Sequence, residues 1–438
     1  MRREVLKSII LFILVITSAV LTYMVWSYQP EFAEVETNIN TSSNIGETED
    51  VSFNQTMRAY QLVHVDGSDI TGTIQDDIIV GIREYLSGTE VSEVNVFNSL
   101  NRLDEVTKAD GSEDFLIVDY PSNMPMKSLF QVLGFHYDGS TPDYNFSRII
   151  VDLGEDNIVF YLINDSLDRV AIAPTDIDSE RLISILDDHE DGFEEYLGVI
   201  TNQQTSNSKT AIYGPSQPGS MPVENFLSTQ ISPELMNSIL FTNDEYNSEQ
   251  SDQVSIYEGA QNIAKYNLDT YGYTYTNLDE SLTGEYDPHQ TIHKSFTFLK
   301  SHTGLTNRNI LFDYHSDENQ SVYRTTMNGH VVFSETINNV ISVKYGQNSV
   351  YEYTRPLLRV NAKVPGEQDK ELVPLENVRY QIALNENLDL QKVSRIIIGY
   401  NMTFSSEQTE LNVLEYTPEW YVQYDGEWFM FDEGGLEN

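Results

Sequence analysis

The hydrophobic pattern of the chain begins with one long apolar run and continues with short alternating segments. Residues 8–28 carry no charge, and residues 9–21 are almost wholly apolar. As an α-helix, these 21 residues span about 31 Å, the thickness of one hydrocarbon core. A buried helix of a soluble protein seldom stays uncharged on every face over this length. The run therefore predicts a transmembrane helix.

The outer end of this run distinguishes a retained anchor from a cleaved signal peptide. A secretory apolar region is about 7–15 residues long and ends in small residues. Here the run is longer and ends in Tyr23, Trp26 and Tyr28, bulky residues that suit the membrane interface. Basic residues precede the run and acidic residues follow it, and positive charge stays in the cytoplasm. We expect a single-pass anchor over residues 1–30, with a cytoplasmic N-terminus and an extracytoplasmic remainder, at the cell membrane.

The pattern after the anchor changes twice before residue 201. Residues 31–50 are polar and acidic, which predicts a flexible stalk. Apolar positions from Ile74 to Leu86 form one helical stripe, with Thr73 and Asp76 at capping positions. Residues 178–188 also predict a helix, residues 115–120 predict a buried strand, and residues 148–153, 158–163 and 169–174 predict an antiparallel meander. Residues 51–200 thus form a first α+β domain.

A polar segment rich in Ser, Asn, Gln, Gly and Pro, residues 201–222, predicts a domain boundary. After it, the pattern over residues 223–241 predicts a helix that restarts at Pro233, behind Ser232. Strands are expected at residues 254–259 and 271–277. We assign residues 201–291 to a middle α+β domain.

The remaining residues, 292–438, have the clearest hairpin signals. Asn328-Gly329 and Asp425-Gly426 each join two strand-like runs, and such dipeptides favour type I′ turns. Helices are expected at residues 292–302 and 375–390, and a strand at 393–404, a pattern that suggests a repeated helix–hairpin unit. The sequence predicts an α+β fold: a transmembrane helix followed by three extracytoplasmic domains with mainly antiparallel sheets.

Composition excludes several classes of function. The chain has 68 acidic and 25 basic residues, for a formal net charge of −43. Such a surface repels nucleic acid. There is no cysteine, so disulfides, a thiol nucleophile and thiolate metal ligands are excluded.

Candidate catalytic and metal-binding patterns are incomplete. His289 and His293 have the i, i+4 spacing of metal ligands on a helix but lack the Glu of H-E-x-x-H. Ser206 and Lys209 have S-x-x-K spacing, without the S-D-N and K-T-G partners. The sequence therefore predicts no catalytic, cofactor-binding or metal site, and we expect a protein that is not an enzyme.

The N-terminal block resembles the YycH family, whose members have a short basic head, one retained helix and a three-domain exterior. The resemblance rests on Trp26, Tyr28, Gln29 and Pro30, and on the C-terminal stretch LEYTPEWYVQYDGEWFMF, which is similar to the ending shared with the sister YycI proteins. It implies a regulator that binds the sensor histidine kinase YycG (WalK) beside YycI and tunes this control of cell-wall metabolism, largely through transmembrane helices. It implies no catalytic residue.

One feature of the anchor itself supports a partner in the membrane. Ser18 and Thr22 form a small-xxx-small pair, which lets two helices approach closely in lipid. We expect this pair to form the packing face, with Tyr23, Trp26 and Tyr28 as interface anchors. Two alternatives stay open: a tethered binding module, and a wall-associated enzyme on a tether.

Overall fold

The computed structural model describes residues 50–100, 103, 114–137, 139–154, 156–199, 208–241, 245–284, 286–302, 304–366, 368–406, 412–432 and 435–437. The predicted anchor and stalk, residues 1–49, lie outside this set. Among the helices described, none has the length and apolar character needed to span a bilayer.

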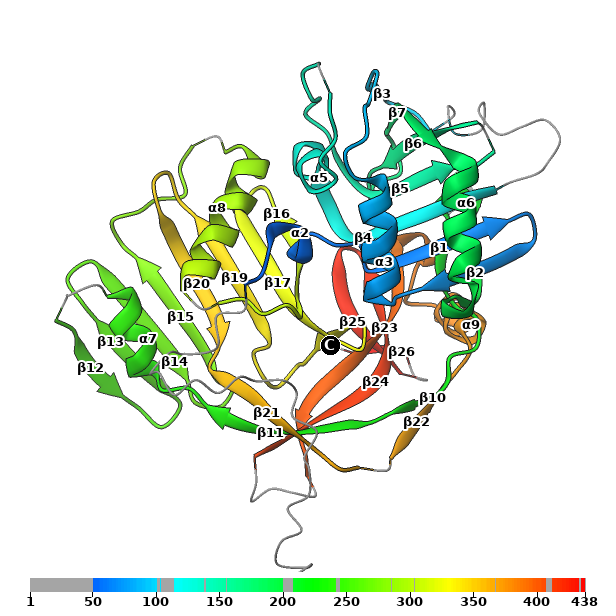
Figure 1. The fold of residues 1–438 in the computed structure, drawn as a ribbon. Coiled ribbons are helices and arrows are strands. Elements are labelled where there is room, and N and C mark those ends of the chain that lie inside the picture. The colour runs from blue at the N-terminus through cyan, green and yellow to red at the C-terminus, as the bar shows by residue number, and fades with distance from the viewer. Residues whose placement is uncertain are drawn as a thin grey trace, which may run out of the picture.

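A nine-stranded sheet forms the first lobe, and its strand pairs are all antiparallel in the described residues. The strand order is β3-β7-β6-β5-β4-β1-β2-β8-β9. Three helices, α3, α5 and α6, belong to this lobe (Figure 1). The strands are β1 (Gln61–Asp66), β2 (Asp69–Thr73), β3 (Asn95–Phe97), β4 (Asp114–Pro125), β5 (Asn145–Asp152), β6 (Asn157–Ile163), β7 (Val170–Asp178), β8 (Glu194–Val199) and β9 (Ile212–Pro215); the helices are α3 (Asp76–Leu86), α5 (Met126–Val132) and α6 (Ser179–Asp188).

Alternation along β4 explains why both faces of this sheet are covered. Leu116 and Val118 join the apolar cluster that includes the helices, whereas Phe115 and Ile117 join a second cluster on the opposite face. Successive side chains of a strand point to opposite faces, so a nearly continuous apolar run predicts a strand buried on both sides.

A second, fifteen-stranded sheet bends into two halves that share β17. One half, with α7 and α8, is the second lobe: β12-β13-β14-β15-β20-β19-β17-β16. The other half, with α9 and the β10–β22 pair, is the C-terminal lobe (Figure 1). Among these strand pairs, β18–β23 is parallel and the others are antiparallel.

The strands and helices of the second and C-terminal lobes have the following bounds, given in chain order. The strands are β10 (Gly219–Pro222), β11 (Glu224–Gln230), β12 (Asn247–Gln250), β13 (Val254–Glu258), β14 (Asn262–Asn267), β15 (Gly272–Asn277), β16 (Asn309–His315), β17 (Gln320–Met327), β18 (His330–Phe333), β19 (Val340–Tyr345), β20 (Val350–Pro356), β21 (Leu358–Val364), β22 (Asp369–Leu372), β23 (Val393–Phe404), β24 (Val413–Tyr424), β25 (Glu427–Asp432) and β26 (Gly435–Glu437). The α-helices are α7 (Pro233–Leu240), α8 (Pro288–Ser301) and α9 (Leu375–Leu384), and short 3-10 turns are η1 (Glu190–Gly192), η2 (Ser208–Thr210) and η3 (Leu390–Lys392).

The mainly antiparallel α+β prediction is confirmed, and so are both hairpins. Asn328 and Gly329 have φ values of 51° and 82°, and Asp425 and Gly426 have values of 54° and 89°, as a type I′ turn requires. The meander of β5, β6 and β7 and the helices α6 and α8 also match the predicted segments.

Two local predictions are wrong. The segment 224–230 is strand β11 instead of helix, because it pairs with both β21 and β24 and buries alternate residues. Only the part of the predicted helix that restarts at Pro233 is helical, and it forms α7 with Pro233 in its first turn. The helix α3 begins behind Gln75 instead of Thr73, and Ile74 precedes it. Thr73 Oγ1 accepts a hydrogen bond from the backbone N–H of Gln75 at 3.1 Å, so Thr73 stabilises the turn before the helix.

Strand pairing crosses the expected domain limits. β9 lies beyond residue 200 but completes the first sheet, while β11 and β15 pair with strands from the last third of the chain. The described strands of residues 201–291 therefore form no sheet of their own.

The first described helix, α2 (Phe53–Thr56), lies between the first and second lobes (Figure 1). Phe53 packs against the rings of His293 and Phe296 of α8, with centroid distances of 5.3 and 5.4 Å. Arg83 of α3 donates to the carbonyl of Asn54 at 2.9 Å. The chain thus contacts both lobes immediately after residue 49.

Candidate functional site: a pocket where the lobes meet

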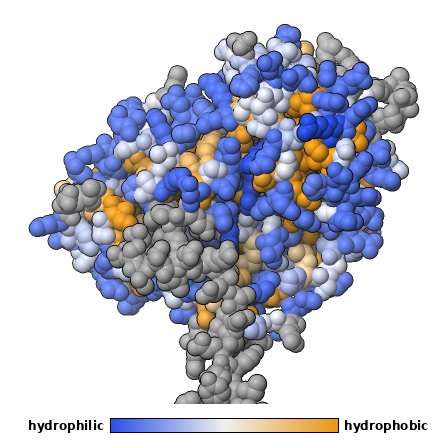
Figure 2. Space-filling view, in the orientation of Figure 1, coloured by the Kyte–Doolittle hydropathy of each residue, from blue (hydrophilic) through white to orange (hydrophobic). Residues whose placement is uncertain are grey.

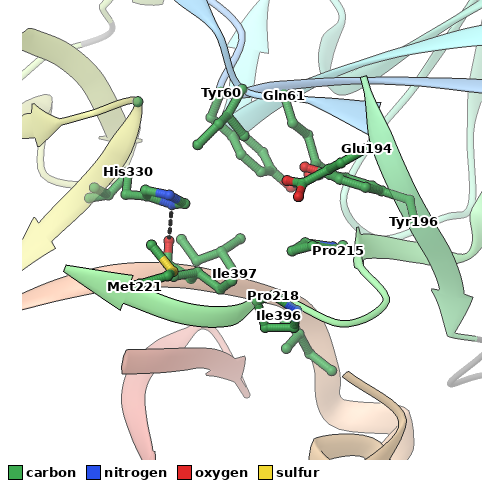
Figure 3. A pocket seen from close by; sticks show the side chains of 15 residues that line it. Tyr60, Gln61, Glu194, Tyr196, Pro215, Pro218, Met221, His330, Ile396 and Ile397 are labelled. Carbon is green, nitrogen blue, oxygen red and sulfur yellow. Dashed lines mark hydrogen bonds between the residues drawn. The ribbon is translucent and has the colours of Figure 1, made fainter. Parts of the chain in front are cut away.

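A pocket of about 180 Å³ opens where the first and C-terminal lobes meet the β17–β18 turn (Figure 3). Strands β1, β8 and β9 contribute one wall, the turn contributes another, and β23 forms part of the floor. The lining residues are Tyr60, Gln61, Ile74, Glu194, Tyr196, Gly214, Pro215, Pro218, Met221, Gly329, His330, Val331, Ile396, Ile397 and Ile398.

The ring of Tyr196 lies against the first sheet because the position of β2 beneath the ring is a glycine, Gly72. A Cβ at Gly72 would lie 2.4 Å from the Tyr196 ring, so a larger residue there would displace the ring from the wall. Glu194 is two positions earlier on the same strand, and its side chain therefore points to the same face. Figure 3 shows both side chains reaching toward Tyr60 and Gln61.

Glu194 is a carboxylate without a compensating group nearby. Glu194 is exposed at the edge of the pocket, and among the described residues its side chain has neither a hydrogen-bond donor nor a cation within contact distance. The protein atoms beside it still displace part of its water, which raises its pKa. Burial penalises the charged form, and a donor supplied from outside would offset this cost.

His330 forms part of the opposite wall (Figure 3). Its Nδ1 lies 3.2 Å from the carbonyl oxygen of Ile398 and, because a carbonyl can only accept, must carry the proton. Burial lowers the pKa of His330 to about 4, so the ring is neutral at pH 7. The remaining nitrogen, Nε2, is therefore an acceptor.

A buried ion pair lies behind the first-lobe wall. Arg148 donates two parallel hydrogen bonds to Asp119, at 2.6 and 2.8 Å, and Gln61 Nε2 donates to the same carboxylate at 2.9 Å. Burial lowers the pKa of Arg148, but the charge and hydrogen bonds of Asp119 outweigh burial, and the pKa is raised overall. Arg148 also donates to the carbonyls of Lys209 and Ala211, which holds the chain leading into β9.

A second ion pair joins the lobes across the same junction. Arg395 of β23 contacts Asp165 in the first lobe, and their side chains are 8% and 28% exposed. Burial lowers the pKa of Arg395, but the charge of Asp165 and its hydrogen bond with Arg395 outweigh burial, and the pKa is raised overall. A charged pair with so little exposure holds its geometry closely, because separating the partners leaves a charge without compensation.

The chemistry of the pocket suits binding. Its polar side chains are the Glu194 carboxylate, the His330 ring, the Gln61 amide and the hydroxyls of Tyr60 and Tyr196. Its floor is formed by isoleucine, proline and methionine, and no serine, threonine or lysine nucleophile lines it. Within the described ranges, no group of three or more His, Asp or Glu side chains is placed to hold a metal ion.

The residues singled out in the sequence lie apart from this pocket. Ser18, Thr22, Tyr23, Trp26 and Tyr28 lie outside the described residues, as does Ser206. On α8, His289 Nδ1 lies 3.0 Å from Ser128 Oγ, and burial lowers the pKa of His289. Lys209 is buried with its ammonium 5.6 Å from the centre of the Phe115 ring.

Sequence reasoning missed the groups that build the junction. Asp119, Arg148 and Arg395 each lie directly beside an apolar run of a strand, and a charge next to such a run is the signal that could have identified them. Glu194 and His330 carry no comparable signal, because each is an ordinary polar residue at a strand end.

Comparison with known proteins agrees with this architecture. The model of the YycH protein N-terminal domain matches residues 4–192, and that of the YycH protein C-terminal domain matches residues 209–434. The chain is 21% identical to the "Two-component system WalR/WalK regulatory protein YycH" of Bacillus subtilis (strain 168), over 97% of this chain and 96% of that protein.

A solved structure shares the fold. The crystal structure of YycH from Bacillus subtilis superposes with a TM-score of 0.64 and 16% sequence identity, covering 87% of this chain and 97% of that one. Because the two family models together match most of the chain, this protein belongs to the YycH family.

Proposed function

We propose that this protein is a membrane-anchored, non-enzymatic regulator of a two-component system of the WalR/WalK type. The observation that carries the proposal is the match over almost the entire chain to a relative named as a regulatory protein of that system. A full-length match includes the N-terminal segment, where the sequence predicts a retained helix. The proposed partners in the membrane are the sensor kinase YycG (WalK) and the sister protein YycI.

The position of α2 suggests how the exterior communicates with the anchor. The helix begins at Phe53, close to residue 49, and contacts α3 of the first lobe and α8 of the second. A change in the angle between these lobes would move α2, and with it the start of the predicted stalk. In this proposal the lobes modulate the anchor, and the anchor contacts the kinase through the face of Ser18 and Thr22.

Modest energies suffice for this mechanism. A partner shifts a two-state kinase only by its differential affinity for the two states, and about 1.4 kcal/mol changes that equilibrium tenfold. Helix packing through small residues supplies about 1–2 kcal/mol.

The test measures kinase output from a target promoter in cells that carry different parts of the protein. The full chain and the anchor alone should regulate, and Ser18→Leu with Thr22→Leu should reduce the effect. Ala19→Leu with Val20→Leu, on neighbouring faces of the same predicted helix, is the control for insertion and expression. The transmembrane mechanism is wrong if the exterior alone regulates as well as the full chain while the anchor alone has no effect.

The second candidate function is a tethered binding module, and the pocket is the observation that favours it. The two candidates differ in one respect: a binding module would act without the kinase. The test deletes this protein in cells whose kinase is locked in one signalling state. If the deletion then has no phenotype, the protein acts through the kinase as a regulator. If the phenotype persists, the protein acts as a binding module.

A further inference from the structure

Two hydrogen-bond acceptors, Glu194 and His330, line the pocket between the lobes. Glu194 presents a carboxylate, and His330 presents the unprotonated Nε2, because its Nδ1 proton is used by the carbonyl of Ile398. Both groups accept hydrogen bonds. An anion or a carbonyl oxygen would find no complementary group at either position, whereas a ligand with N–H donors would.

The state of Glu194 points to a positively charged donor. Within the described part of the chain its carboxylate contacts neither a cation nor a donor, and although Glu194 is exposed at the edge of the pocket, partial desolvation by the walls raises its pKa. A cation that enters would remove this penalty and form charge-assisted hydrogen bonds. The net charge of −43 would also raise the local concentration of small cations around the protein.

The remaining surface of the pocket is suited to the apolar part of such a ligand. Pro215, Met221, Ile396 and Ile397 are apolar, and the rings of Tyr60 and Tyr196 complete the walls (Figure 3). Aromatic rings beside a carboxylate are a common environment for ammonium groups. A cavity of about 150 Å³ accommodates benzene, so the 180 Å³ found here has room for an alkyl chain of four carbons with its ammonium.

We propose that this pocket binds a protonated primary amine on a short aliphatic stem, with the ammonium at Glu194 and the stem on the isoleucine–proline floor. The amine has two possible sources with the same chemistry: a free alkylamine, or the lysine side chain of a protein. Because the pocket walls come from the first lobe, the C-terminal lobe and the β17–β18 turn, an occupant would bind to all three at once. Binding would therefore strengthen the contact between these three parts of the molecule.

The test is calorimetric titration of the full chain in zwitterionic nanodiscs. The probes are n-butylamine and Nα-acetyl-lysinamide, with n-butanol and Nα-acetyl-norleucinamide as isosteres without the charge. We expect the amines to bind and the isosteres to bind at least about tenfold more weakly, because a charge-assisted hydrogen bond is lost. Equal binding of the two classes, or no binding of either amine, would overturn the proposal.

A pair of variants locates the site. Glu194→Gln should weaken amine binding at least about tenfold, since the shape stays and the charge is lost. Glu195→Gln is the matched control: it is the next residue of β8, so its side chain points to the opposite face, and binding should be unchanged. Equal losses in both variants would mean general attraction by the acidic surface and would refute the site. Tight binding of Nα-acetyl-lysinamide over n-butylamine identifies a protein side chain as the source, and the reverse order identifies a free amine.

Discussion

At the scale of single residues, the junction of the lobes depends on charges in places where apolar residues are usual. Asp119 is 3% exposed and is surrounded by the donors of Arg148 and Gln61. Transfer of a carboxylate from water to such a position is costly, and the bidentate contact with the guanidinium offsets the cost. The pair is therefore a sensitive point for mutation.

We predict that Asp119→Leu lowers the free energy of unfolding by about 3–5 kcal/mol, because it leaves the buried Arg148 charge without its partner. The double variant Asp119→Leu with Arg148→Met removes both charges and should recover part of this loss. Urea denaturation followed by far-UV circular dichroism measures both. If the free energy of unfolding falls less in the single variant than in the double variant, the two charges do not compensate each other.

A second residue-scale prediction concerns pH. The pKa of His330 is about 4 in the folded protein and 6.5 in the unfolded chain, so the unfolded state binds the proton more readily. The contribution to stability is complete above pH 6.5 and is lost as the pH falls from 6.5 toward 4. Between pH 7.5 and 4.5 the loss is about 2–3 kcal/mol, at 1.36 kcal/mol for each pKa unit.

The variant His330→Asn isolates this contribution, because asparagine keeps a donor for the carbonyl of Ile398 and does not titrate. Its free energy of unfolding should fall less between pH 7.5 and 4.5 than that of the unmodified protein. Parallel pH profiles for the two proteins would show that His330 is protonated in the folded state as easily as in the unfolded state.

At the scale of elements, two turns of the same type have different surroundings. Both hairpins use a glycine with positive φ, which fits the demands of a type I′ turn. A Cβ at Gly426 would have no atom within 4 Å, whereas a Cβ at Gly329 would lie 2.7 Å from the carbonyl oxygen of Ile74. The turn after β17 is thus also a contact with the first lobe.

This difference predicts unequal costs for the same substitution. Gly426→Ala should cost about 1–2 kcal/mol, the strain of an alanine in a left-handed conformation. Gly329→Ala should cost a further 1–3 kcal/mol or so, because the backbone of Ile74 must move. Thermal denaturation of the two variants provides the comparison. Similar losses would mean that the first lobe yields to the added methyl group without cost.

At the scale of the whole molecule, the lobes are joined by both apolar and charged contacts. One cluster of buried apolar side chains continues from the helix face of the first lobe into the second lobe. In Figure 2, hydrophobic residues are visible between polar regions on the face where these lobes meet. The contact between Arg395 and Asp165 attaches the C-terminal lobe to the first, and Arg58 contacts both Asp76 and Thr326.

We predict that Asp165→Ala loosens the first lobe from the C-terminal lobe and lowers the free energy of unfolding by about 2 kcal/mol, because Arg395 loses a charged partner. Amide hydrogen exchange should become faster at residues 395–398 of β23. Asp168→Ala is the control, since Asp168 lies in the same turn but accepts from Asn164 within its own lobe. Slow exchange at β23 in both variants would show that the apolar contacts alone hold the lobes together.

Local sequence patterns determined the helices and strands in which buried residues recur at the regular spacing of that element. The segments around Ile149, Ile158 and Leu182 and the dipeptides Asn328-Gly329 and Asp425-Gly426 carry their own periodicity or turn chemistry, so β5, β6, α6 and both hairpins could be predicted. Family membership was also readable, because motifs at both ends of the chain are short and local.

Tertiary structure alone decided the rest. Residues 224–230 have a pattern compatible with a helix, and they form β11 because β21 and β24 offer hydrogen-bonding edges on both sides. The pocket could not be predicted either, since Glu194 and His330 are 136 positions apart and line the same pocket only because β17 ends against the first lobe. Spacing along the chain reports on neighbours within a helix or strand, whereas a site between lobes depends on contacts that are long-range in sequence.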